Sequence, residues 1–328
     1  MRRRDFLIST LLPFVPSLGK ASVVRPNPSF SFPRDHGAHP EFRTEWWYIT
    51  GWTDDPVGFQ VTFFRAKPNV DERNPSAFTP RQVILAHAAV ADPKRGRLVH
   101  EERAARAGFS LAEAETARTG VWIDDWSLVQ DGNRYHARLP GRELDLDLHF
   151  MANALVLQGE NGFSRKGHRP EEASYYYSRP HMNVVGKVNG RDATGVAWLD
   201  HEWSSAYLAP EASGWDWCGI NFFDGRSLMA FRIRAKAGGT HYSPPGVSFE
   251  ALRTWRSPRT GVVYPIEMLV KANGKTIKLV PLIDDQELDA RRSTGTIYWE
   301  GAVRAFEGSN EVGRGYLELT GYWKPLKL

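Results

Sequence analysis

Five tight-turn signals constrain the fold of this chain more than any other feature of its sequence. Asn189-Gly190 and Asn273-Gly274 are Asn-Gly pairs, Asp131-Gly132 and Asp224-Gly225 are Asp-Gly pairs, and Asp54–Gly58 is a Pro-containing turn. Asn-Gly and Asp-Gly favour β-hairpins, because the type I′ turn requires a positive φ at both central residues. With strand-like runs between these turns, the sequence predicts an antiparallel all-β protein.

The segments between the turns have the composition and the periodicity of strands. Glu45–Trp52, Gly58–Arg65 and Val83–Ala91 are rich in aromatic and β-branched residues, and Leu144–Phe150 alternates strictly between apolar and polar residues. Such alternation is typical of a strand with one buried face and one solvated face. We predict one short helix, over the Ala- and Glu-rich segment Leu111–Arg118.

The length of 328 residues favours two domains, because a single hydrophobic core rarely grows to that size. We place the break after Ser205, which gives an N-terminal domain over residues 22–205 and a C-terminal domain over residues 206–328. So many antiparallel strands must protect their edges. Closure of each sheet into a barrel does this, and a pair of sandwiches with aromatic cores is the alternative.

The first 21 residues are predicted to be an export signal rather than part of the fold. Arg2-Arg3-Arg4 precedes an apolar run that ends near Leu18, a pattern typical of a secretory signal, and Arg3-Arg4 favours the twin-arginine route. A Sec signal or a lipid-facing anchor is the alternative. The expected location is therefore the periplasm, with membrane association left open.

Charge and motifs exclude several classes of function. Residues 1–21 contain four basic residues and one acid, so the remaining chain has a net charge near +1 and no electrostatic case for nucleic acid. No phosphate-binding loop, nucleophile elbow or HExxH pattern is present, so we expect neither a cofactor nor a metal. The single Cys218 cannot form an internal disulfide and is expected to be a buried apolar residue.

The stretch from Tyr175 to Trp217 contains the strongest candidate for a site. Asp200, His201 and Glu202 are consecutive and are followed by Trp203. On a strand, His201 would point away from the face shared by Asp200 and Glu202. One interpretation makes these residues acid/base catalysts. In the other, the two acids form salt bridges at a domain junction with Arg179 or Arg43.

Further site candidates lie on the aromatic strands. Glu45 precedes three aromatic residues and is a candidate catalytic carboxylate if it points inward, or a charge at the rim if it points outward. For His87, which lies on the predicted strand Val83–Ala91, a hydrogen-bonded barrel histidine is favoured over a metal ligand. The residues that we expect to line a ligand site are Trp203, Trp47, Tyr177, His87 and Trp217.

Several segments together resemble one family. They begin at Phe32-Pro33-Arg34-Asp35-His36-Gly37 and Glu45-Trp46-Trp47-Tyr48 and continue with Tyr177-Ser178-Arg179-Pro180, Trp198–Ser205 and Gly214-Trp215-Asp216-Trp217. They are similar to the lipocalin-like family that includes the bacterial AttH proteins and the CrtC-type carotenoid hydratases. The fungal lipocalin-like Diels–Alderases are more distant relatives.

The resemblance implies two lipocalin-like (calycin-type) β-barrels and a hydrophobic or lipid-like ligand. For the AttH branch it implies an association with an ABC-type export or lipoprotein-trafficking system. For the hydratase branch it implies a hydro-lyase that acts on an alkene or polyene, with a site that includes His201 and Trp203. The hydratases also use an acid on a later strand, and the matching segment Ser227–Arg232 contains none. The leading hypothesis is therefore an exported ligand-binding protein, and an acid/base hydratase, isomerase or cyclase is the alternative.

Overall fold

The computed structural model describes residues 21–71 and 73–326. The predicted signal over residues 1–21 therefore lies almost wholly outside the described residues. In the described part, regular structure consists of strands and two short 3-10 helices, η1 (Arg34–His36) and η2 (Pro93–Arg95). No helix among these residues is long and apolar enough to span a membrane.

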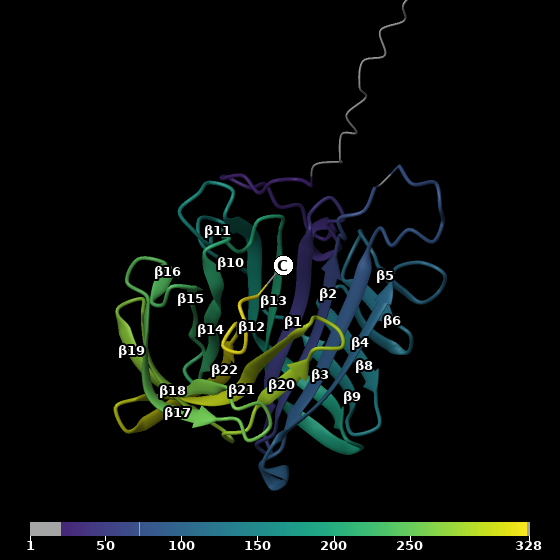
Figure 1. Cartoon of the computed structure of the whole chain (residues 1–328). Helices are drawn as coiled ribbons and strands as arrows, with labels where there is room; N and C mark the ends of the chain where they lie inside the picture. Colours follow the sequence, from purple (N-terminus) through teal and green to yellow (C-terminus); the bar gives the residue numbers. More distant parts are fainter. Residues whose placement is uncertain (1–20, 72, 327–328) are drawn as a thin grey trace, which may run out of the picture.

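The first sheet contains thirteen antiparallel strands. Eleven follow the order β4-β3-β2-β1-β13-β12-β9-β8-β7-β6-β5, while β10 and β11 pair with β12. β4 lies close to β6, so the sheet curls round on itself (Figure 1). The bounds are β1 (Thr44–Thr53), β2 (Gly58–Ala66), β3 (Val83–Ala91), β4 (Leu98–Arg106), β5 (Ala112–Ala114), β6 (Gly120–Ile123), β7 (Trp126–Asp131), β8 (Arg134–Pro140), β9 (Asp145–Met151), β10 (Val156–Leu157), β11 (Phe163–Arg165), β12 (Ala173–Val188) and β13 (Arg191–Ser204).

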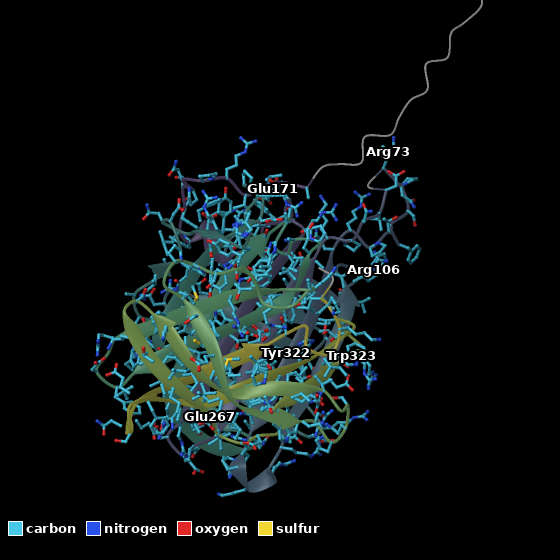
Figure 2. All side chains as sticks on the ribbon, turned by 60° about the vertical axis from the view of Figure 1, so that its left-hand side comes forward. Arg73, Arg106, Glu171, Glu267, Tyr322 and Trp323 are labelled. Atoms are coloured by element: carbon cyan, nitrogen blue, oxygen red, sulfur yellow. The ribbon has the colours of Figure 1, made fainter. Side chains whose placement is uncertain are left out.

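The second sheet contains nine antiparallel strands in the order β16-β15-β14-β22-β21-β19-β18-β17, with β20 paired to β21. β15 also contacts β17 and β18, so this sheet curls as well. The segment after β22, labelled at Tyr322 and Trp323 in Figure 2, packs on β14 through a hydrogen bond from the Tyr322 hydroxyl to Asp216. The bounds are β14 (Ala212–Phe222), β15 (Ser227–Ala235), β16 (Thr240–Tyr242), β17 (Ser248–Arg256), β18 (Val263–Ala272), β19 (Lys275–Pro281), β20 (Glu287–Ala290), β21 (Thr296–Glu307) and β22 (Asn310–Leu319).

The predicted all-β class and the two barrel-like sheets are confirmed, and each of the five turn signals joins two paired strands. The turns are not all of one kind. Both residues have positive φ at Asn189-Gly190 and at Asn273-Gly274, as a type I′ turn requires. At Asp131-Gly132 and Asp224-Gly225, only the glycine has positive φ. The predicted turn positions are thus correct, but the type I′ geometry holds for the Asn-Gly pairs alone.

The predicted helix over Leu111–Arg118 is wrong. This segment forms the short strand β5, which pairs with β6, and then turns before Gly120. Eight residues are too few to nucleate a stable helix without tertiary support. Here the neighbouring sheet edge offers backbone partners, so pairing with that edge replaces the local Ala and Glu propensity.

The two sheets pack against each other through β1, β2, β12 and β13 on one side and β14, β21 and β22 on the other, and β4 contacts β20. Gly58 on β2 is a point of close approach. A side chain there would place its Cβ 2.5 Å from the Cβ of Ala302 and 2.8 Å from the hydroxyl of Tyr316. The absence of a side chain at Gly58 therefore allows the sheets to meet.

We expect Gly58→Val to destabilise the protein by about 1–3 kcal/mol, and Gly58→Ala to have a smaller effect, because each added methyl overpacks this contact. Urea unfolding of both variants would measure the free energies. Strand propensity alone predicts the opposite order, since valine is favoured over alanine in strands. A valine variant more stable than the alanine variant would contradict the close-packing argument.

Candidate functional site

Strand alternation sends the consecutive residues of β13 to opposite faces of the first sheet. β1 and β13 pair in the register Tyr48↔Asp200 and Trp47↔His201. Asp200 and Glu202 face the second sheet and line a cavity between the two sheets. His201 and Trp203 face the interior of the first barrel, which is filled by its hydrophobic core.

The cavity between the sheets has a volume of about 300 Å³. Its deep part is formed by buried side chains, whereas Phe64, Ala66 and Leu85 are partly exposed. A volume of this order is sufficient for a small organic ligand. The aromatic residues that line it come from both sheets and are Trp46, Tyr48, Phe64, Tyr176, Tyr207, Trp215, Trp217 and Tyr298.

Asp200 is a buried carboxyl group with neutral hydrogen-bond partners. Its oxygens accept hydrogen bonds from the Tyr176 hydroxyl at 2.6 Å, the Ser178 hydroxyl at 2.5 Å and the Trp198 indole at 2.7 Å. Burial raises the pKa of Asp200 to about 7, because these donors only partly offset the loss of solvation. A carboxyl group of this kind exchanges its proton near neutral pH.

Two further carboxyl groups reach the cavity from the second sheet. Glu300 on β21 accepts a hydrogen bond from the Tyr48 hydroxyl, and Glu318 on β22 accepts one from the Trp215 indole at 2.7 Å. Burial raises the pKa of Glu300 well above its usual value, and it raises that of Glu318 to about 7. Glu300 is almost inaccessible, whereas Glu318 is partly exposed to the cavity.

Glu202 differs from these three carboxyl groups because it has a cationic partner. The ammonium group of Lys166 lies 2.7 Å from its carboxylate, and both side chains are buried. Burial raises the pKa of Glu202, and the neighbouring Lys166 lowers it in part. Lys166 also lies over the rings of Tyr207 and Phe231, at 5.0 Å and 4.0 Å, so it connects the two sheets.

A separate polar network fills one end of the first barrel around Glu45. The Glu45 carboxylate accepts hydrogen bonds from His39 Nδ1 at 2.7 Å, His201 Nε2 at 2.9 Å and Arg65 Nε at 2.7 Å, as well as from the His39 amide. Burial alone would raise the pKa of Glu45, but these donors and the Arg65 charge hold it well below its usual value. His201 also contacts the Tyr177 hydroxyl at 3.1 Å.

Comparisons with known proteins agree with this architecture. The AttH-like family model matches residues 23–322.

The chain belongs to the AttH-like family. A crystal structure of an AttH protein from Nitrosomonas europaea shares 46% identity with a TM-score of 0.85, and the match covers 92% of this chain and 99% of that one. Kievitone hydratase from Nectria haematococca has the same fold, with a TM-score of 0.62, 16% identity and coverage of 95% of this chain and 99% of that one. A comparison with curated proteins found no match.

The predicted site residues of this AttH-like chain are divided between the two places. Asp200, Glu202, Trp217 and His87 line the cavity between the sheets. The side chains of Glu45, His201, Trp203, Trp47 and Tyr177 lie in the first barrel. The predicted salt bridges of the acids with Arg179 or Arg43 are replaced by the ion pair between Glu202 and Lys166.

Several cavity residues are not predicted from the sequence. Glu300, Glu318 and Gln60 lie far from the central motif along the chain, and no local pattern distinguishes them. Tyr48 is the exception. It lies three residues from Glu45 on the same strand, so the two side chains point to opposite faces of β1, with Glu45 in the barrel and Tyr48 at the cavity. The acid expected on Ser227–Arg232 by resemblance is absent there, but β21 and β22 supply carboxyl groups to the same cavity.

Among residues 21–71 and 73–326, two groups of three side chains have the composition of metal ligands, although the sequence indicated no metal site. His39, Glu45 and His201 are buried, and His136, Asp147 and His149 lie on the outer face of β8 and β9; in each group the ligand atoms lie within 4.8 Å of one another. In the first group, hydrogen bonds between these residues and Arg65 already use the Glu45 carboxylate fully. We therefore interpret the first group as a structural network.

Asp200 gives this AttH-like protein a testable pH dependence. Because its pKa is raised from 3.8 to about 7, its stabilising contribution is present below pH 3.8 and is lost as the pH rises to about 7. Asp200→Asn removes the cost of ionisation. We therefore expect its stability relative to wild type to be about 2–3 kcal/mol greater at pH 8 than at pH 5.

Urea unfolding of Asp200→Asn and wild type at both pH values would measure this difference. The exposed Asp192→Asn on the same strand is a matched control, since its carboxylate is ion-paired with Lys187 on the surface. A difference in stability that is the same at pH 5 and pH 8 would mean that Asp200 does not titrate with a raised pKa.

Proposed function

We propose that the protein binds a small, largely apolar molecule in the cavity between its two sheets. The observation that supports this most directly is the composition of the cavity, which eight aromatic residues from both sheets line together with several polar groups. Ligand sites commonly combine an apolar wall with a few convergent polar groups that fix the orientation of the ligand. The periplasmic location and an ABC-type partner remain predictions from the sequence.

The aromatic wall provides the test of binding. Trp46, Trp215 and Trp217 line the cavity, so a ligand bound there is expected to change the tryptophan fluorescence. The full chain would be titrated with a panel of apolar alcohols, fatty acids and polyenes. Natively purified protein would also be extracted with organic solvent and analysed by mass spectrometry. If no compound alters the fluorescence and no molecule is extracted, the proposal fails.

A variant at the cavity rim identifies the site of binding. Ala66 lies at the partly exposed end of the cavity, and Ala66→Trp is expected to obstruct it. Ala104→Trp on β4 is the matched control, because Ala104 is exposed and does not line the cavity. Binding that survives Ala66→Trp as well as it survives Ala104→Trp would place the ligand elsewhere.

A second candidate function is acid catalysis on an alkene in the same cavity, and the raised pKa of Asp200 favours it. A protonated Asp200 could transfer its proton to one alkene carbon, water could add to the resulting cation, and the added water could return a proton to the carboxylate. This sequence is a hydration and leaves the acid unchanged. The apolar wall would suit an alkene or polyene substrate.

The two candidate functions are separated by Asp200→Asn. If the protein is a catalyst, this variant is expected to retain ligand binding and to lose at least about a hundredfold in turnover, the usual contribution of a general acid. Products formed from a polyene panel would be followed by mass spectrometry as an 18-Da gain or an isomer. The turnover of His201→Ala is measured for comparison. His201 lies in the barrel interior and not at the cavity, so this variant leaves Asp200 and the other cavity carboxyl groups unchanged. Equal turnover by wild type and Asp200→Asn would exclude Asp200 as the acid.

A further inference from the structure

The polar groups around the cavity are unbalanced between hydrogen-bond donors and acceptors. Several aromatic donors are already used within the protein: Tyr48 donates to Glu300, Trp215 to Glu318, Tyr176 to Asp200, and the Trp217 indole to the Tyr176 oxygen. Asp200 accepts three hydrogen bonds, Glu300 two and Glu318 one. A carboxylate offers about four lone-pair sites, so acceptor sites remain free, most of them on Glu318 and Glu300. A ligand that enters the cavity therefore meets mainly acceptors.

Gln60 provides an independent observation that points to a ligand. It lines the cavity and is about 1% exposed, and its Oε1 atom has no hydrogen-bond partner. Its Nε2 atom donates to Thr62 at 2.9 Å and to Glu300 at 3.2 Å. A buried acceptor without a partner is costly, so a donor on a bound molecule would satisfy it.

Most of the carboxyl groups around the cavity also lack a cationic partner. Glu202 is neutralised by Lys166. In the described part of the chain, by contrast, no lysine, arginine or histidine forms an ion pair with Asp200, Glu300 or Glu318. Three carboxyl groups around one cavity thus have only neutral partners. A positive charge in the cavity would stabilise their ionised forms.

The aromatic wall is also suited to a cation. The rings of Trp46 and Trp215 are stacked with their centroids 6.5 Å apart, and Tyr207 meets both rings edge-on, at 4.9 Å and 5.3 Å. Aromatic faces attract organic cations, and aromatic clusters are a recurrent recognition element for ammonium groups. Lys166 beside Tyr207 is an example within the protein itself.

We propose that the ligand of the inter-sheet cavity is an organic ammonium compound with an apolar body, whose charged nitrogen is held by Glu300, Glu318 and Gln60. This inference rests on the proposed function, because it names the chemical class of the molecule that the cavity binds. An ammonium N–H supplies donors for the free acceptor sites, and its charge would favour ionisation of the carboxyl groups, which burial otherwise disfavours. The apolar body packs against the indole rings.

A matched series of three probes tests the class of ligand. The probes are 4-phenylbutylammonium, 4-phenylbutan-1-ol and 4-phenylbutanoate, titrated into the full chain by calorimetry at pH 7.5. We expect the ammonium compound to bind at least about tenfold more tightly than the alcohol, and the carboxylate to bind most weakly. If the alcohol binds as tightly as the ammonium compound, this inference fails and the proposed function stands. If no probe binds and no compound of the apolar panel binds either, both this inference and the proposed function are contradicted.

Isosteric variants identify the groups that recognise the charge. Glu300→Gln and Glu318→Gln are each expected to weaken ammonium binding about tenfold or more and to change alcohol binding by less than about twofold. Glu307→Gln, an exposed position on the same strand as Glu300, is the control. Thermal melts would verify that each variant is folded. Ammonium affinity that is unchanged in both cavity variants would overturn the assignment of the charge to these carboxylates.

Discussion

Glu45→Gln is expected to destabilise the protein by about 3–5 kcal/mol, the cost of removing one partner from a buried ion pair. Arg65 is about 2% exposed, and its guanidinium Nε lies 2.7 Å from the Glu45 carboxylate. A neutral amide cannot balance that charge. It also cannot accept all of the hydrogen bonds that His39, His201 and Arg65 now donate.

The free energy would be measured by urea unfolding, with Glu41→Gln as the control, because Glu41 is nearby and exposed. The pH dependence adds a second readout. The pKa of Glu45 is held well below its usual value of 4.5, so its contribution is present above that pH and is lost as the pH falls through the folded pKa. A Glu45→Gln variant within about 1 kcal/mol of wild type would show that the network is not charged as we describe.

Lys166→Met is expected to cost a similar amount, about 3–5 kcal/mol, because it leaves Glu202 buried without its cation. The ammonium group of Lys166 lies 2.7 Å from Glu202 and 4.0 Å from the ring centroid of Phe231. Methionine has a similar length and no charge, so it retains most of the packing of the lysine stem. The loss would therefore report on charge rather than on volume.

The double variant Lys166→Met/Glu202→Gln provides the decisive comparison. Because replacing both members of a buried pair by neutral groups is often nearly neutral, we expect it to recover at least half of the loss seen in Lys166→Met. Urea unfolding of the two single variants and the double variant completes the cycle. Additive losses in the double variant would mean that Lys166 and Glu202 do not interact across the junction.

Local sequence rules explain much of the fold and little of the cavity. Asn-Gly pairs at 189–190 and 273–274 form hairpins because their φ preference is intrinsic. Alternation along β13 separates His201 from Asp200 and Glu202, because successive side chains of a strand point to opposite faces. The same rules fail over residues 111–118, where an available sheet edge outweighs a weak helical propensity.

The position of the ligand cavity depends on contacts between distant segments. Trp47, Tyr177 and Trp203 were expected to line a ligand site, but the structure places their side chains in the packed core of the first barrel. Glu300 and Glu318 join Asp200 only because β21 and β22 pack across the outer face of β1 and β13. No local pattern reports that packing.

The sequence alone thus determined the strand content, the hairpins, the resemblance to the AttH-like family and the opposite directions of His201 and Glu202. These features follow from backbone preferences and from the two-residue period of a strand, which act over short distances. The tertiary structure decided which carboxyl groups share a cavity and which acquire a cationic partner. Burial and pairing set the charge of Glu45, Asp200 and Glu318, and both depend on the way in which the two sheets meet.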